Sequence, residues 1–173
     1  MAKPMSWGPS RTGYYDAVRG ANLVQEDAFK SKPNTATDSG VEEFKEGEWA
    51  TVGATGLAEK ATGTVAASAA VYPNVVGYER SDFRGSKSAT LALGIGFWLE
   101  TSGWEQVTKT ADDFPAGTEC TIKDGVLFPA VSTNLVRAIV RRAPVNAPTM
   151  AQKALQKSAF TTVLVEIVHY IKP

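Results

Sequence analysis

Short runs of alternating apolar and polar residues dominate the chain from about residue 41 onward. The runs at 47–53, 56–64 and 74–80 are bounded by glycine or proline, and the alanine-rich stretch 64–71 is expected to be a loop that enters a strand. Many short strands with regular turns are typical of a sandwich or barrel. The pattern predicts a mainly β domain over residues 41–173. This domain is expected to be a small β-barrel or β-sandwich, and a jelly-roll-like topology is one option.

The longest apolar run, residues 87–103, alternates with a period of two. One face is aliphatic and aromatic, and it contains Leu91, Leu93, Ile95, Phe97 and Leu99. The other face contains Gly94, Gly96 and Trp98, so we expect a strand with a bend or a close approach by another backbone at the glycines. The next run, 104–110, is expected to be the return strand.

Residues 114–130, "FPAGTECTIKDGVLFPA", predict a β-hairpin. The Asp124-Gly125 pair supplies the two positive φ angles of a type I′ turn. Strand alternation places Thr118, Cys120 and Ile122 on one side, so we expect Cys120 to be buried as a small apolar residue. Asp112 and Asp113 precede the Pro115-Gly117 bend and are expected to stabilise a turn.

Two further strands are predicted near the C-terminus. The run 134–144 alternates with arginines on both faces, which places the guanidinium groups at an edge or an interface, and the apolar run 161–171 must pair inside a sheet. Between them, Thr149 is a plausible N-cap for one short helix near 149–160.

Residues 1–40 are expected to form an extended N-terminal arm. They are rich in proline and glycine and have few consecutive aliphatic residues, yet they contain Trp7, Tyr14, Tyr15 and Phe29. This composition predicts a segment that becomes ordered against another surface, either its own domain or a neighbour, with a partly disordered terminus as the alternative.

Composition narrows the class of protein. Eighteen Lys and Arg residues balance eighteen Asp and Glu residues, which gives no strong electrostatic footprint for nucleic acid or an anionic membrane. Cys120 is the only cysteine, so the chain has no internal disulfide. No stretch resembles a signal peptide or is long enough to span a bilayer, so we expect a soluble, unexported protein.

Residues with catalytic or metal-binding chemistry are scarce. His169 is the only histidine, so the sequence offers neither a cluster of histidine metal ligands nor a second histidine for catalysis. We expect the His169 imidazole to have a structural role. The acidic pairs at 42–43 and 112–113 are adjacent in sequence, which points neighbouring carboxylates to opposite faces of a strand or into a turn. We therefore expect no enzyme activity, no catalytic residues, no cofactor and no metal.

A partner-binding role is the remaining use for the unusual aromatic and cationic residues. The candidates are Trp7, Tyr14, Tyr15, Trp98, Arg137, Arg141 and Arg142. The arginines suit ion pairing across a subunit interface, and the alternative is a solvated strand edge that is protected from aggregation by its charge. Trp49 and Trp104 are expected in the core.

The order of these segments resembles the capsid decoration, or cement, proteins of tailed bacteriophages. The resemblance covers about residues 42–171. It depends on the following segments and on their order along the chain: "EFKEGEWATV", "GLAEKATGT", "NVVGYER", "LGIGFWLET", "DDFPAGTECTIKDGVLFPA", "NLVRAIVRRAP" and "LVEIVHYI". It departs at the helical insertion, 147–160.

The resemblance implies a virion structural protein made in the host cytoplasm. Such a protein binds the outer capsid surface, stabilises contacts between major capsid protein subunits and has no enzyme activity. Its partners would be the major capsid protein and further copies of itself, as a trimer or dimer, with no direct contact to nucleic acid or membrane.

Three alternatives remain open at the level of sequence. The chain could be a head-tail or tail structural protein, or a carbohydrate-binding β-module that uses Trp98 and Trp104 as stacking platforms. A hydrolase is the third alternative.

Overall fold

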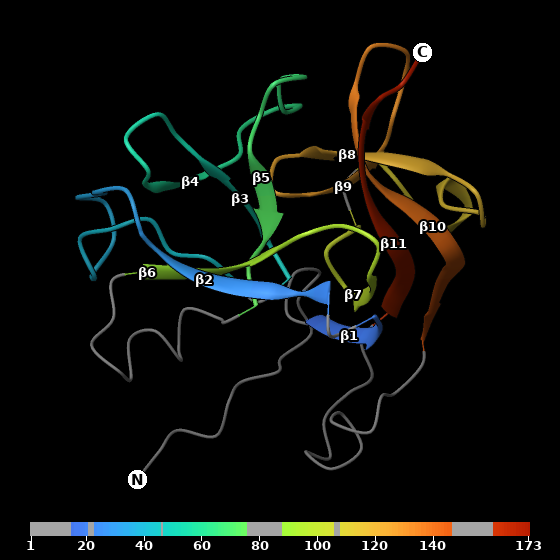
Figure 1. Ribbon diagram of the computed structural model, residues 1–173, viewed down its shortest axis with the longest axis horizontal. Helices are drawn as coiled ribbons and strands as arrows, with labels where there is room; N and C mark the ends of the chain where they lie inside the picture. Colours follow the sequence, from blue (N-terminus) through green and yellow to red (C-terminus); the bar gives the residue numbers. More distant parts are fainter. Residues whose placement is uncertain (1–14, 21–22, 46, 76–87, 106–107, 147–160) are drawn as a thin grey trace, which may run out of the picture.

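The computed structural model describes residues 15–20, 23–45, 47–75, 88–105, 108–146 and 161–173, with the backbone alone for 15–18 and 146 (Figure 1). The described part is mainly β, and all pairings between its strands are antiparallel. No helix within these residues is long and apolar enough to cross a membrane. The prediction of a mainly β fold is confirmed.

The largest sheet has six strands. Their order across the sheet is β1 (Tyr15–Arg19), β7 (Trp98–Thr101), β11 (Thr161–Ile171), β10 (Leu135–Asn146), β8 (Glu119–Lys123) and β9 (Val126–Pro129). The long strands β10 and β11 form its centre, where antiparallel pairing runs from Leu135 opposite Ile171 to Asn146 opposite Thr161. Both the 134–144 strand and the 161–171 strand are therefore confirmed.

Two smaller sheets accompany the large one. One has three strands in the order β4 (Ala58–Lys60), β3 (Trp49–Val52) and β5 (Val71–Pro73), and the other consists of β2 (Gln25–Lys30) and β6 (Ser88–Leu93). The described strand pairings leave the sheets open, because the large sheet ends at β1 and β9. The architecture is consistent with a β-sandwich, and the barrel alternative is wrong for this part of the chain.

Strand β3 lies between two hydrophobic cores. Trp49 is fully buried in the larger core with residues of β7, β10 and β11, whereas its neighbour Ala50 is buried in a smaller core with Phe44 and Leu91. Successive side chains on a strand point to opposite faces, so β3 contributes to both cores at once. This arrangement packs the three-stranded sheet on the large sheet and on β6.

The predicted strand over 87–103 is two strands that belong to different sheets. Strand β6 pairs with β2, and β7 pairs with β1 and β11. Between them, Gly94 and Gly96 have φ angles of 104° and 87°, which a glycine adopts at no steric cost. The predicted bend is confirmed, but Ile95 is 58% exposed rather than on the buried face, because the backbone turns away from the core there.

The predicted Asp-Gly hairpin is confirmed as β8 and β9. Asp124 and Gly125 have φ angles of 51° and 79°, as a type I′ turn requires, and Asp124 Oδ1 accepts a hydrogen bond of 2.6 Å from the backbone N–H of Gly63. Cys120 is fully buried, which raises the pKa of its thiol to about 12. Thr121 is buried as well, so both faces of β8 are covered.

The expected return strand at 104–110 is wrong for its described residues. A short 3-10 turn, η2 (Ala111–Asp113), follows Thr110, and the Asp113 carboxylate accepts a 2.8 Å hydrogen bond from the Thr110 N–H. This bond, followed by the coulombic attraction of Lys109, keeps the pKa of Asp113 below its usual value despite some desolvation. The turn role predicted for this acidic pair is confirmed.

Residues 15–19 and 25–30 are part of the sheets rather than an extended arm. Strands β1 and β2 pair with β7 and β6, and Val24 and Phe29 pack against the larger and the smaller core. These contacts bury apolar side chains that would be exposed on an extended arm. Residues 1–14 and the helix expected near 149–160 lie outside the described residues, and the domain division at residue 40 stays a prediction.

Candidate functional site

A row of aromatic and charged side chains crosses one face of the six-stranded sheet. Strand register places Arg19 of β1 opposite Trp98 of β7, and Trp98 opposite Glu166 of β11. Residues directly opposite one another in antiparallel strands share a face. We call this row, together with Arg141 of β10, the arginine–tryptophan row.

Trp98 is the centre of the row. The guanidinium carbon of Arg19 lies 4.7 Å from its ring centroid, and that of Arg141 lies 5.9 Å away, which are cation–π distances. Arg141 Nε also donates a 2.8 Å hydrogen bond to Glu166 Oε2. Trp98 is half-buried, so its ring is partly accessible while the arginines are held against it.

Arg142 lies beside this row in a second ion pair. Its Nη2 donates to Glu100 Oε1 at 2.7 Å, and the Thr162 hydroxyl donates to the same oxygen at 2.8 Å. Glu100 is two residues beyond Trp98 on β7, so the two residues share a face. The structure thus brings together three of the predicted partner-binding residues: Trp98, Arg141 and Arg142.

Two exposed apolar side chains lie close to Arg19 and Trp98 in the chain. Leu23 is 51% exposed and Ile95 is 58% exposed. Their loops are in contact, because a Cβ built at Gly94 would be 2.7 Å from the Leu23 carbonyl oxygen, and Leu23 Cδ1 lies 3.5 Å from the Cβ position of Gly96. The contact places two apolar residues on adjoining loops that flank strands β1, β2, β6 and β7.

Arg137 is not part of this surface, which corrects the prediction that all three arginines lie at an edge or an interface. Its side chain is among the largest fully buried ones in the described residues. Register shifts on both sides of this stretch of β10 interrupt the simple alternation, and the guanidinium packs 5.8 Å from the Trp49 ring and 5.5 Å from the Tyr72 ring. It therefore contacts the three-stranded sheet.

Backbone carbonyls, rather than carboxylates, accept hydrogen bonds from Arg137. Nε donates to the Val71 carbonyl at 3.2 Å and Nη1 donates to the Val168 carbonyl at 2.8 Å, so one guanidinium joins β5 to β11. Burial lowers the pKa of Arg137 to about 10, which still leaves the side chain charged at neutral pH. Its role is to connect two sheets.

His169 is the third polar contact of Arg137. The two side chains are joined by a 2.9 Å hydrogen bond between Arg137 Nη1 and His169 Nδ1, in which the guanidinium must donate and the imidazole nitrogen must accept. Desolvation, followed by the charge of Arg137, lowers the pKa of His169 below 6.5. The structural role expected for this imidazole agrees with its contact.

We expect folding stability to fall when His169 becomes protonated. The unfolded chain, with a histidine pKa of about 6.5, binds a proton at a higher pH than the folded chain, so stability is constant above about pH 7.5 and decreases as pH falls through 6.5 toward the folded pKa. The effect is small because His169 is solvent-exposed. Urea unfolding at several pH values measures it.

The matched variant for this measurement is His169→Asn, because the Asn Oδ1 can accept in place of Nδ1 without titrating. The loss of stability between about pH 7.5 and pH 5.5 should be smaller in the variant than in the parent chain. An identical slope in both proteins would show that another group causes the pH dependence.

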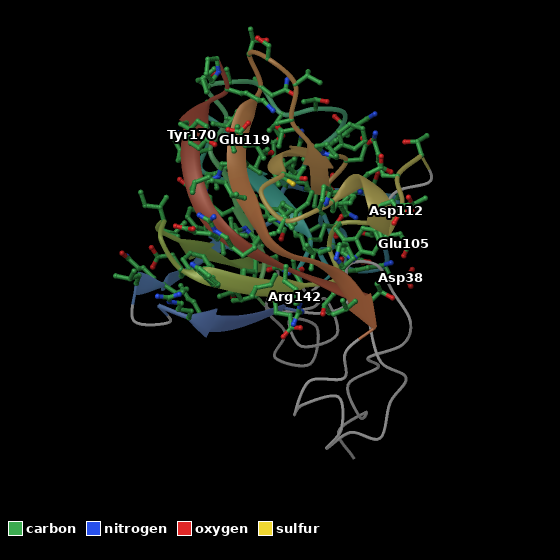
Figure 2. All side chains as sticks on the ribbon, turned by 90° about the vertical axis from the view of Figure 1, so that its right-hand side faces the viewer. Asp38, Glu105, Asp112, Glu119, Arg142 and Tyr170 are labelled. Carbon is green, nitrogen blue, oxygen red and sulfur yellow. The ribbon has the colours of Figure 1, made fainter. Side chains whose placement is uncertain are left out.

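A second polar cluster joins the C-terminal strand to the hairpin. The Tyr170 hydroxyl donates to Glu119 Oε1 and Lys172 Nζ forms a 2.9 Å ion pair with Glu119 Oε2 (Figure 2). The bond from Tyr170, followed by that from Lys172, lowers the pKa of Glu119, and desolvation together with Glu119 raises that of Tyr170 to about 12. The sequence did not predict this cluster, since Glu119 lies on β8 whereas Tyr170 and Lys172 lie at the end of β11 and just after it.

Trp104 and Trp49 are buried in the core, as predicted. The Trp104 ring packs edge-on against Phe114 with centroids 5.4 Å apart, and its indole N–H donates to the Thr161 carbonyl at 2.9 Å. A buried ring cannot stack on a sugar, and Arg19 lies over the Trp98 ring. Of the two stacking platforms of the carbohydrate-binding alternative, Trp104 is therefore not available, and Trp98 is covered in part by Arg19.

The other predicted partner-binding residues are described in part or not at all. Tyr15 begins β1, where its backbone pairs with Thr101, while Trp7 and Tyr14 lie outside the described residues. Within the part of the chain that the structure describes, no three His, Cys, Asp or Glu side chains are grouped so that they could hold a metal ion.

Comparison of the chain with protein-family models, with curated proteins and with solved structures found no match.

Proposed function

We propose that this chain is a virion structural protein that binds the outside of a tailed-phage capsid and stabilises contacts between major capsid protein subunits. It acts by binding rather than by catalysis, and it contacts neither nucleic acid nor membrane directly. The order of sequence segments from 42 to 171 supports this assignment. In this proposal the open sheets belong to a jelly-roll-like sandwich.

The arginine–tryptophan row is the observation on which the proposal depends. Tryptophan and arginine are the residues most enriched where protein interfaces gain their binding energy. Here Glu166 orients Arg141, and Trp98 orients both arginines, so little side-chain freedom remains to be lost when a partner binds. The exposed Leu23 and Ile95 add apolar area for the same contact.

A rigid domain of this kind suits a lattice. Strand β3 contributes to two cores, and Arg137 joins two sheets, so the row is presented by a well-packed scaffold. A modest affinity at each capsid site is sufficient, because self-association and repetition over the shell multiply weak contacts.

The direct test mixes the purified chain with tailed-phage capsids that carry no decoration protein. We expect the chain to co-sediment with the capsids, to appear as added density on their outer surface in electron micrographs, and to raise the temperature at which they disrupt. Density confined to the portal vertex or the tail would instead support a head-tail or tail protein.

Trp98→Ala should weaken capsid binding about tenfold or more while the domain remains folded. Trp98 is half-buried and outside both cores, so its removal affects mainly the exposed row. Val131→Ala is the matched control, since Val131 is 67% exposed in a turn that belongs to neither loop beside the row. Circular dichroism checks folding, and co-sedimentation measures binding.

Equal binding by the Trp98 variant and the parent chain would exclude the row as the capsid contact. Failure of the parent chain to bind any such capsid would exclude the proposed function itself.

A further inference from the structure

Strand β2 presents a regular and exposed sheet edge. It pairs with β6 through six consecutive residue pairs, from Gln25 opposite Leu93 to Lys30 opposite Ser88, without a register shift (Figure 1). Within the part of the chain that the structure describes, no other strand pairs with it. All of its residues except Phe29 are exposed, so its free edge offers unpaired backbone groups to another strand.

The sheet edges at β4, β5 and β9 are less suited to pairing than the edge at β2. Lys32 N–H donates to the Ala58 carbonyl along β4, and Leu127 N–H of β9 donates to the Gly103 carbonyl. Strand β5 ends in Pro73, which has no N–H to donate. These features make β2 a more suitable strand for pairing with another chain than β4, β5 or β9.

Two of the three charges on β2, Glu26 and Lys30, lie at equal distances on either side of Ala28. Glu26, Ala28 and Lys30 share one face of the strand by alternation, and Phe29 on the other face packs against the smaller core. Glu26 and Lys30 are roughly 13 Å apart along an extended strand, too far to pair with each other. Neither forms an ion pair with a side chain in the described ranges.

We propose that β2 is a self-association edge, at which two copies of this chain pair their β2 strands antiparallel about a twofold axis at Ala28. In this register Glu26 lies opposite the partner's Lys30, and the symmetric contact repeats this pair, so two of the three charges on each strand face an opposite charge. The third, Asp27, is on the other face and lies opposite the partner's Phe29. The two small sheets then join into one sheet in the order β6-β2-β2-β6, which is more stable than a two-stranded sheet alone.

A second copy fits this edge because the strand is complementary to itself. The opposite charges lie at equal distances on either side of Ala28, and this residue is small enough to meet its own copy on the axis. Charged residues also protect an edge strand from aggregation, because burying a charge in an interface is unfavourable and like charges repel. This protection does not depend on which of the positions is acidic and which is basic. Self-pairing requires opposite signs at positions 26 and 30.

Charge reversal distinguishes these explanations. Light scattering after size-exclusion chromatography, and sedimentation velocity over a range of concentrations, should show a dimer for the parent chain. Glu26→Lys or Lys30→Glu alone places like charges opposite each other twice and should weaken the dimer roughly tenfold. The double variant E26K/K30E restores opposite charges and should dimerise like the parent.

Asp38→Lys is the matched control. It changes the net charge by as much as Glu26→Lys does, at an exposed position on the other side of the molecule from β2 (Figure 2). It should leave the dimer unchanged. Thermal unfolding of every variant confirms that the monomer is folded.

Two results would overturn the proposal: a parent chain that stays monomeric at the highest concentration reached, or a dimer whose affinity is the same in both single variants. Failure of the double variant to recover would also overturn the Glu26–Lys30 register. None of these results bears on capsid binding, which monomers can perform and which is measured separately.

Discussion

Replacing Arg137 with alanine should lower the free energy of unfolding by about 2 to 4 kcal/mol, as measured by urea unfolding at neutral pH. The change removes the hydrogen bonds from Arg137 to the carbonyls of Val71 and Val168, and it removes the side chain that packs near Trp49 and Tyr72. Alanine also removes the cost of burying a charged group, which partly offsets these losses. This cost is not compensated by an ion pair, because no carboxylate among the described residues pairs with the Arg137 guanidinium.

Arg137→Met separates the two effects. Methionine fills most of the volume without a charge, so we expect a smaller loss of about 1 to 2 kcal/mol that reflects the removed hydrogen bonds. The matched control is Arg141→Ala on the same strand, whose exposed ion pair with Glu166 contributes about 1 kcal/mol or less. A parent-like stability for Arg137→Ala would show that this residue does not hold the sheets together.

Gly94→Ala should cost about 2 to 4 kcal/mol of unfolding free energy. Gly94 has a φ of +104°, which side chains rarely adopt, and an added Cβ would be 2.7 Å from the Leu23 carbonyl oxygen. Because the obstacle is backbone, no rotamer change relieves the contact, and the two loops beside Trp98 must separate. Denaturant unfolding measures the loss.

Gly117→Ala is the control that measures only the cost of placing alanine at a positive φ angle, without a steric contact. Its φ is +95°, similar to that of Gly94, but no atom lies within 4 Å of the added Cβ. We expect a loss of about 1 to 2 kcal/mol there, from the strained conformation. Equal losses at the two positions would mean that the loop contact at Leu23 relaxes without cost.

The candidate surface was predicted in part. The pattern indicates Trp98 because this residue shares a strand face with glycines, and it indicates Arg141 and Arg142 because arginines are unusual in an apolar strand. Arg19 and Glu166 were not predicted, although Glu166 is the only acidic residue from 137 to the end of the chain. They join the row only because β1, β7, β11 and β10 are neighbours in the sheet, although β1 precedes β7 by about eighty residues.

The N-terminal segment shows the same limit. Its composition indicated an arm that becomes ordered against its own domain or a neighbour but did not say where, and Val24 and Phe29 pack on the two cores of the same chain. Their burial depends on strand β6, some sixty residues later in the sequence. Local composition contains no information about such a distant pairing partner.

The sequence by itself determined the features that depend on neighbouring residues. The Asp124-Gly125 turn follows from two residues that tolerate positive φ, and the bend at Gly94 and Gly96 follows from glycine's freedom. Only the tertiary structure decided which sheets the strands on either side of that bend join, and that Arg137 is buried while Arg141 is exposed. Those outcomes depend on strand order, on bulges in β10 and β11, and on packing between sheets, and such interactions link residues that are far apart in the chain.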